Sequence, residues 1–383
     1  MELHLLDSSW DVVHVLDSFE EMIWVDRYWD EGEFKVRTLP SSGILTALNT
    51  ARYARFNLSE HIMVIEDIEI ERSPEEMTAM LIIQGRSLES ILDRRIVWDR
   101  TYMDGLVFTT LNQVFDDNII SPTDTSRQIQ NFSLETPTDP SILGMSINTQ
   151  YHGDTILKVV KEICRAKEIG FKCILTSTGN IEMYLYNGID RSYNQTENPY
   201  VVFSPGFDNL QNATYIESSR LEKTIVLIAG EEGVGNQRFL TTFEAPGGAL
   251  SGLERKETYF EPSVQRNIGS TEMSDEDYTL HLQGRGKEEL AKQTRIYVFD
   301  GETDTSTYVY GLSGDFYMGD IVQVGDEFGH ERELRVTEMI YSHDGSGEKI
   351  YPAFTTKSKA HNLNGQSIKT GIPTISAPTL TSA

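Results

Sequence analysis

The sequence predicts a mainly β protein with α+β insertions, in which two β-barrel units lie near the two ends of the chain. Three observations predict this fold class. Short β-rich runs separated by Gly, Asp or Pro dominate the first hundred residues and the stretch after Phe207. A strongly amphipathic helix followed by two strands interrupts these runs in the middle of the chain. Two β segments far apart in the sequence also share similar residues at the same spacing.

The first hundred residues read as strands. Met22–Arg37 is rich in β-branched and aromatic residues and is broken by the turn residues Asp30, Glu31 and Gly32. The runs His61–Ile70 and Met77–Gln84 are expected to pair as a hairpin with its tip at Glu71–Glu76. Simple alternation in His61–Ile70 predicts that one face carries Ile62, Val64, Glu66, Ile68 and Ile70.

A short helix over Leu88–Arg95, capped by Ser87, is expected to end this region. We therefore predict a first β-barrel domain over residues 1–100. A helix at Met103–Asp117 follows, because its apolar residues recur with a period near 3.6. Residues 121–150 are polar and contain Pro, which predicts an irregular connection.

The clearest helix lies at Thr155–Ile169, with Asp154 as the expected N-cap and Gly170 as the residue that ends it. The strands Phe171–Thr176 and Ile181–Tyr186 come next. A helix beside a small sheet predicts an α+β domain over residues 101–205. The two cysteines, Cys164 and Cys173, fall on this helix and the first of these strands, and their number favours folding in a reducing compartment.

The rest of the chain is again β-rich. A strand at Thr224–Ala229 leads into a glycine-rich turn, Gly230–Gly235, and a helical insertion is expected at about 275–295. Short strands are then expected at Arg295–Phe299, Thr307–Tyr310, Ile321–Val324, Leu334–Tyr341 and Ile350–Phe354. They predict a second β-barrel domain over 206–355. Residues 356–383 have few apolar side chains, so we expect an extended tail that lies against a neighbouring protein.

Two of the predicted strands resemble each other. Ile65, Asp67, Ile68 and Ile70 match Val336, Glu338, Met339 and Tyr341 in spacing and type. Each segment then leads into a polar turn and another β run. This similarity predicts that one β unit occurs twice in the chain.

The charge and composition exclude several classes of protein. The chain has 59 acidic and 33 basic residues, a formal charge of −26, which disfavours nucleic-acid binding and anionic membrane surfaces. The N-terminal residues do not resemble a signal peptide, and there is no apolar run long enough for a transmembrane helix. We expect no direct membrane span and no specific binding of DNA.

A search for catalytic and metal-binding motifs is negative. His330 and Glu331 begin a zinc-protease pattern, but Leu334 stands where the second His is needed. Gly284–Lys287 lacks the flanking residues of a phosphate-binding loop. The His residues are scattered, and no acid pair stands out among the carboxylates. The sequence therefore predicts no catalytic residue, metal or cofactor, and a protein that is not an enzyme.

Two motifs resemble the tail-hub proteins of siphophages, the baseplate-hub or tail-tip proteins of long-tailed phages. The first runs through Met22–Phe34 and Val64–Trp98, and the second through Tyr310–Val324 and Val336–Phe354. The positions that match the family are Trp24, Arg27, Tyr28, Trp29, Gly85, Arg86, Ser87, Leu88, Asp93, Arg94, Arg95, Tyr310, Gly311, Gly319 and Asp320. Apart from the resemblance, the types of these residues have structural explanations. The tryptophans suit a core or an interface, Asp93 and the arginines suit the end of a helix, and Gly319-Asp320 suits a turn into a strand.

The resemblance implies a structural virion protein with two tail-tube-like β-barrel domains, assembled in the cytoplasm of the bacterial host and located at the distal end of the tail. Proteins of this kind form homotrimers, so that six barrels meet a sixfold tail tube, close its end and open for genome ejection. The implied partners are the distal tail protein ring, the C-terminus of the tape-measure protein, and tail fibre, spike or other baseplate proteins near 356–383. DNA would pass through the channel without specific binding.

Two other interpretations stay open at this point. The same hub fold could belong to a contractile injection particle or a myophage baseplate. A protein of another class, a cell-wall hydrolase or a host-carbohydrate binder, would show turnover or binding by the isolated chain.

Overall fold

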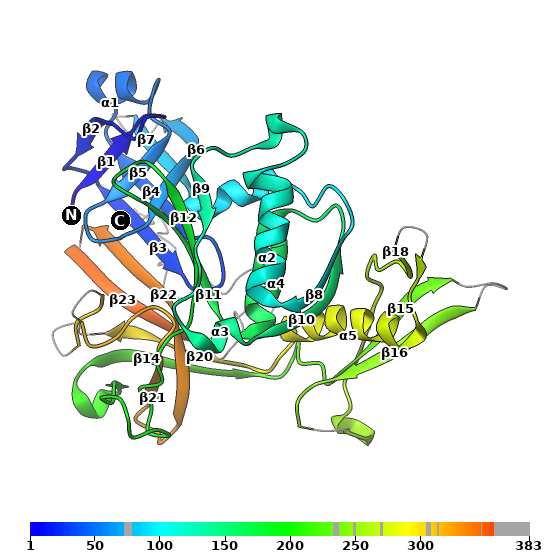
Figure 1. The fold of residues 1–383 in the computed structure, drawn as a ribbon. Helices are drawn as coiled ribbons and strands as arrows, with labels where there is room; N and C mark the ends of the chain where they lie inside the picture. The colour runs from blue at the N-terminus through cyan, green and yellow to red at the C-terminus, as the bar shows by residue number, and fades with distance from the viewer. Residues whose placement is uncertain are drawn as a thin grey trace.

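The computed structural model describes residues 1–72, 79–232, 237–247, 250–268, 271–303, 308–311, 314–345 and 347–355. The fold is mainly β with α+β insertions, as the sequence predicts. Figure 1 shows the strands from the two ends of the chain side by side, with the helices α2 (Val107–Phe115) and α4 (Ile156–Lys167) next to them. The predicted hairpin tip, the turn after Ala229 and the tail 356–383 lie partly or wholly outside the described residues.

The N-terminal region forms seven strands and two short helices in the described residues. Its strands are β1 (Leu3–Leu6), β2 (Val12–Leu16), β3 (Glu21–Arg27), β4 (Glu33–Thr38), β5 (Tyr53–Phe56), β6 (Ile62–Glu71) and β7 (Met80–Ser87). Its helices are α1 (Ser42–Ala47) and the 3-10 helix η1 (Leu88–Arg94). The predicted hairpin of β6 and β7 is therefore confirmed, and the α-helix expected at Leu88–Arg95 is a 3-10 helix instead.

The middle region packs α2 and α4 against two small sheets. Its remaining elements are β8 (Thr101–Leu106), η2 (Asp116–Ile120), η3 (Thr125–Arg127), β9 (Phe132–Leu134), α3 (Pro140–Leu143), β10 (Ser146–Tyr151), β11 (Gly170–Leu175) and β12 (Ile181–Tyr186). The prediction of an irregular 121–150 is wrong, because β9 and β10 pair with β12 and β8. The helix expected from Met103 begins only at Val107, since Thr101–Leu106 pairs with β10 as a strand.

The caps of α4 also differ from the prediction. Thr155, not Asp154, is the N-cap, and its hydroxyl accepts a hydrogen bond from the Lys158 backbone N–H at 3.3 Å. At the other end Glu168 adopts a left-handed backbone with φ of 61°. Gly170 therefore does not end the helix but begins β11, where its missing side chain leaves room for the ring of Tyr28.

The C-terminal region completes the fold. Its elements are β13 (Val202–Phe203), η4 (Pro205–Phe207), β14 (Leu210–Ser218), β15 (Ile225–Glu232), β16 (Arg238–Glu244), η5 (Gly252–Glu254), β17 (Glu257–Phe260), β18 (Asn267–Ile268), β19 (Thr271–Glu272), α5 (Asp275–Ala291), β20 (Ile296–Thr303), β21 (Ile321–Gly325), β22 (Glu331–Asp344) and β23 (Gly347–Thr355). The helix expected at 275–295 is α5. The strand expected at Thr307–Tyr310 is not formed by its described residues, where Tyr310 makes only an isolated bridge to Phe316.

Strands from both ends of the chain join one hydrogen-bonded sheet. Among the described residues it has thirteen strands, in the order β14-β20-β23-β22-β3-β4-β7-β6-β5-β1-β2, with β21 on β22 and β13 on β21. The two halves meet where β3 pairs antiparallel with β22, Arg27 opposite Glu338 and Met22 opposite His343. One apolar core, which includes Trp24, Phe34, Met339 and Tyr341, also spans both halves.

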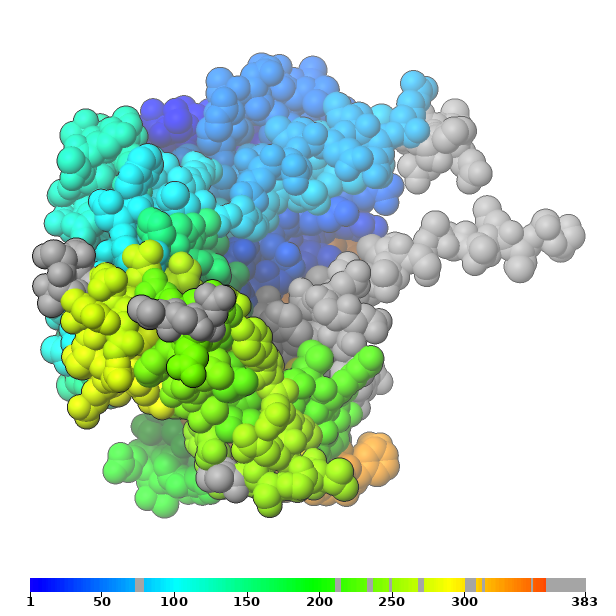
Figure 2. All heavy atoms as spheres, turned by 90° about the vertical axis from the view of Figure 1, so that its right-hand side faces the viewer, coloured from blue at the N-terminus to red at the C-terminus, as the bar shows by residue number. Residues whose placement is uncertain are grey.

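Two further cores lie outside this sheet. One fills the middle region and reaches the other side of β6 through Ile62 and Val64. The other belongs to the segment between β14 and β20, which we call the insertion; it contains β15 to β19 and α5. Seen from the side in Figure 2, the insertion (yellow-green and yellow) covers the face next to the middle region (cyan).

The alternation expected for His61–Ile70 is interrupted. Against β7, the register of β6 shifts between Ile65 and Asp67, so Glu66 is an extra residue in a β-bulge. A single added residue turns the following side chains to the opposite face. Ile68 and Ile70 therefore do not share the buried face of Ile62 and Val64, and they are 48% and 56% exposed.

Candidate assembly interface

The large sheet contains one arrangement of five strands twice. We call β3, β4, β7, β6 and β5 the first β unit, and β14, β20, β23, β22 and β21 the second β unit. Both units have their strands side by side in the same order, and every neighbouring pair is antiparallel. The duplication predicted from the two similar segments, which are β6 and β22, is confirmed at the level of topology.

Both units also have a bulge at the same place. The register of β6 shifts between Ile65 and Asp67, and that of β22 shifts between Val336 and Glu338. These are the positions that the sequence similarity aligns. Equivalent bulges rarely arise twice by chance, because a bulge is a specific local feature of a strand.

Side-chain contacts repeat as well. Trp24 in β3 packs on Phe34 in β4 with ring centroids 5.6 Å apart, and Tyr215 in β14 packs on Phe299 in β20 at 4.9 Å. The indole N–H of Trp24 donates to Asp26 at 2.9 Å, and the hydroxyl of Tyr215 donates to Glu217 at 3.1 Å. Trp24 is therefore the structural equivalent of Tyr215, and Asp26 is that of Glu217.

Arg27 links the two units at their junction. It lies in β3 and donates to Glu338 of β22 at 3.0 Å, while also pairing with Glu33 of β4. Burial disfavours the charged guanidinium, but the two carboxylates outweigh this effect and raise the pKa of Arg27. Arg27 thus carries a charge-assisted contact between strands that are 311 residues apart in the sequence.

Tyr28 and Trp29 lie where the first β unit, the middle region and the second β unit meet. The ring of Tyr28 packs against Gly170 of β11 and Gly319 before β21, where an added Cβ would come within 2.3 Å of it. Its hydroxyl lies 3.3 Å from the Glu168 carbonyl oxygen, and Arg335 of β22 stacks over both aromatic rings. Both side chains are almost completely buried. The aromatic motif therefore holds three regions together.

The second family motif, which contains Gly319 and Asp320, lies at the same junction of three regions. Gly319 has φ of +91°, which favours glycine, and Asp320 accepts hydrogen bonds from Arg191 at 2.7 Å and from the Ile189 backbone N–H at 2.7 Å. Burial raises the pKa of Asp320, and Arg191 counteracts this rise. Tyr310 packs against the shared core beside Gly311, whereas Leu312 and Ser313 lie outside the described residues.

The motif around η1 consists of structural contacts. Arg86 forms a bidentate pair with Glu66 at 2.8 Å and lies 3.7 Å from Asp93. Ser87 is the N-cap residue of η1, as predicted, but its hydroxyl makes no capping hydrogen bond and accepts instead from the Gly32 backbone N–H at 2.7 Å. In the rest of this motif, Leu88 is buried, Arg94 is exposed, and Arg95 donates to the Arg127 carbonyl oxygen. Gly85 belongs to the bulge, since its Cβ would lie 1.9 Å from the Val64 carbonyl oxygen.

A buried ionic network that the sequence did not reveal attaches the insertion to the middle region. Arg285 of α5 bridges Glu162 of α4 at 2.8 Å and Glu288 at 2.6 Å, and Tyr151 donates to Glu288. Burial opposes the charge on Glu162, but Arg285 and Lys292 lower its pKa. Glu162 lies 123 residues from Arg285, and Tyr151 lies 137 residues from Glu288, so no local spacing indicates these two contacts.

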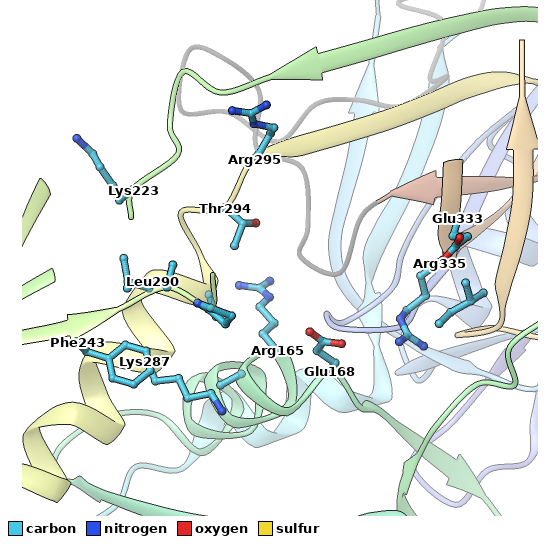
Figure 3. Close-up of a pocket in the computed structure, with 15 residues that line it drawn as sticks. Arg165, Glu168, Lys223, Phe243, Lys287, Leu290, Thr294, Arg295, Glu333 and Arg335 are labelled. Atoms are coloured by element: carbon cyan, nitrogen blue, oxygen red, sulfur yellow. The ribbon is translucent and has the colours of Figure 1, made fainter. Parts of the chain in front are cut away.

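A cavity of about 460 Å³ lies between the insertion, α4 and the start of β22 (Figure 3). Arg165, Lys287 and Arg335 line it together with Glu168 and Glu333. Arg165 is already paired with Asp30 at 2.6 Å, and Arg335 donates to the Gly319 carbonyl oxygen. The described part of the chain has no cluster of His, Cys, Asp and Glu suited to a metal ion, and none of its helices is long and apolar enough to cross a membrane.

Comparisons with known proteins agree with this architecture. The family model described as Siphovirus ReqiPepy6 Gp37-like protein matches residues 2–354. The 43 kDa tail protein of prophage MuSo2 from Shewanella oneidensis has a similar structure, with a TM-score of 0.54, 12% identity, and coverage of 93% of this chain and 99% of that chain. Prophage tail protein gp18 from Listeria monocytogenes EGD-e gives 0.52 and 12%, over 93% and 94%. No curated protein matches in sequence.

Proposed function

Since this chain belongs to the siphovirus ReqiPepy6 Gp37-like family and is a structural protein of the phage tail, we propose that it is the hub at the distal end of the tail. In this proposal three copies form a ring that continues the sixfold tail tube. The ring closes the tube before infection and opens for genome ejection.

The repeated β unit is the observation that carries the proposal. One chain holds two such units joined through β3 and β22. Three chains would therefore present 3 × 2 = 6 similar units in one ring. A threefold object built from duplicated units can contact a sixfold tube with an equivalent surface at every position.

The net charge suits a channel for DNA. Three chains carry 3 × −26 = −78 formal charges. If part of this charge faces the lumen, the wall repels the phosphate backbone, and DNA passes without sticking. The role is structural rather than enzymatic, with no cofactor. The partners would be the distal tail protein ring, the C-terminus of the tape-measure protein, and fibre, spike or other baseplate proteins near residues 356–383.

Cryo-electron microscopy of the particle that contains this chain tests the proposal. The expected map shows three copies at one end of a sixfold tube, with the β units arranged in a pseudo-sixfold ring. Any other copy number, a position away from the tail end, or a lumen lined mainly by Lys and Arg would contradict it. Sheath density around the tube would favour a contractile particle with the same hub.

A further inference from the structure

Within the described ranges, the free edges of the large sheet include the outer side of β14 and the later part of β6. Among the described residues β14 is hydrogen-bonded on one side only, to β20. On β6, strand β5 pairs only with Ile62–Val64, and from Asp67 to Glu71 the strand pairs only with β7. Free strand edges carry unpaired N–H and C=O groups, and they are the usual place for another strand to add.

The internal duplication shows which strand fits the free edge of β6. In the second β unit, the equivalent half of β22 is occupied: β21 pairs with its first part and β3 pairs with Glu338–His343. The equivalent of β22 is β6, and the equivalent of β3 is β14. If the β3–β22 junction is repeated, β14 of one copy pairs with β6 of the next copy.

The register follows from the same equivalence. At the internal junction Trp24 lies opposite Tyr341, and Arg27 lies opposite Glu338. Tyr215 of β14 is the equivalent of Trp24. Ser218, three residues after Tyr215, is therefore the equivalent of Arg27. The aligned segments make Ile70 the equivalent of Tyr341 and Asp67 that of Glu338. Between copies, Tyr215 is then opposite Ile70, and Ser218 is opposite Asp67.

The exposed side chains of β6 agree with this pairing. Ile68 and Ile70 are 48% and 56% exposed, whereas their equivalents Met339 and Tyr341 are buried. Burying two such side chains supplies the apolar part of a strand interface. In the same strand Glu66, Asp67, Glu69 and Glu71 are exposed, and acidic residues on an edge discourage indiscriminate pairing. The edge therefore favours one specific strand over general aggregation.

We propose that copies of this chain associate head to tail, with the free edge of β14 in one copy paired antiparallel to Asp67–Glu71 of β6 in the next. This inference rests on the proposed ring and names its contact. Because the two edges differ, the interface is heterologous, and repetition of it either closes a ring or extends a filament. A twofold contact between identical edges would require different residues to meet.

Disulfide formation between two variants that each carry one added cysteine tests the pairing. Asp67→Cys and Ser218→Cys are made in separate full-length chains, which are mixed, concentrated until native mass spectrometry detects association, and oxidised gently. Opposed residues of an antiparallel pair have Cα atoms about 4.5–5.5 Å apart, within the range of a disulfide. The mixture should give about tenfold or more covalent dimer than either variant alone.

Glu71→Cys mixed with Ser218→Cys is the off-register control, since four residues of a strand span about 13 Å. Cys164 and Cys173 are buried, so the unmodified chain provides the background. Amide hydrogen exchange of the unmodified chain is a second readout, with protection of Glu66–Glu71 and of β14 expected on association.

The outcomes separate the contact from the ring. A selective in-register disulfide together with protection of both strands supports the pairing. Association with equal yields from the off-register control, or with both strands unprotected, overturns the pairing and leaves the ring intact. Absence of association at every concentration counts against the pairing, whereas the copy number in the particle tests the hub role independently.

Discussion

The two β units share a strand order and a bulge, but their first strands, β3 and β14, have different surroundings. At the internal junction, β3 of the first unit is covered by β22, and Trp24 is fully buried. At the other end of the sheet, β14 of the second unit has no second partner among the described residues, and Tyr215 is only partly buried. The same structural position is thus a core residue in one unit and an edge residue in the other.

The charged contacts differ in the same way. Arg27 and Glu338 form an ion pair across the internal junction, whereas their equivalents at the free edges are Ser218 and Asp67. A partly buried ion pair fixes the register of a junction that forms once, during folding. In the proposed association between copies, a polar contact without a full ion pair suits an interface that forms and opens again. The proposal therefore places a permanent and a reversible version of one contact in the same chain.

The largest expected effect separates the two aromatic positions. Trp24→Ala removes a buried indole and should lower the free energy of unfolding by about 3–5 kcal/mol. Tyr215→Ala should cost the isolated chain only about 1–2 kcal/mol, because the side chain is already partly exposed, yet it should abolish association between copies. Chemical denaturation and native mass spectrometry measure the two effects. Equal losses of stability would remove the distinction between core and edge.

The ion pair at the junction gives the next effect. Arg27→Met leaves the carboxylates of Glu33 and Glu338 without their shared cation, and we expect a loss of about 2–4 kcal/mol. Ser218→Met at the equivalent free edge should change stability by less than about 0.5 kcal/mol. A double-mutant cycle with Glu338→Gln isolates the coupling across β3 and β22. A coupling energy of zero would show that the pair does not stabilise the junction.

The bulges provide a smaller and more local test. Gly85 lies opposite the bulge in the first unit, where its Cβ would meet the Val64 carbonyl oxygen at 1.9 Å. Gly85→Ala should cost about 1–3 kcal/mol because backbone must move. Gly345→Ala is the control, as that residue has open space around it. The position equivalent to Gly85 is Phe354, so tolerance of alanine at Gly85 would mean that the two bulges are closer in geometry than the contacts indicate.

Much of this architecture could be predicted from the sequence, and the failures have physical causes. The hairpins, α4, α5 and the similarity of β6 to β22 follow from periodicity and turn residues, and the family resemblance is confirmed. The face of Ile68 and Ile70 was predicted wrongly, because Glu66 has nothing in its side chain that marks a bulge. The β3–β22 junction joins residues 311 positions apart, and the Arg285 network joins residues 123 positions apart. Only the fold brings these residues together.

A buried histidine in the first unit stands where the second unit has an arginine, so we expect a pH dependence of stability at this position of the first unit. His61 lies 3.4 Å from Glu89 and close to Asp26, and its equivalent in the second unit is Arg332 near Glu217. Burial disfavours the imidazolium, but the carboxylates of Asp26 and Glu89 outweigh it and raise the pKa of His61 from 6.5 to about 9. Burial raises the pKa of Asp26 too.

A histidine with a raised pKa stabilises the fold fully below its unfolded pKa, and this contribution is lost as the pH rises through the folded value. Stability should therefore fall between about pH 6.5 and pH 9, by an amount on the order of 1–3 kcal/mol. His61→Gln should flatten the profile over this window, and the exposed His152→Gln should leave it unchanged. Thermal denaturation over a pH series measures this dependence of stability on pH. A slope that survives His61→Gln would assign the titration elsewhere, and the contrast between a titrating cation in one unit and a permanent one in the other would no longer hold.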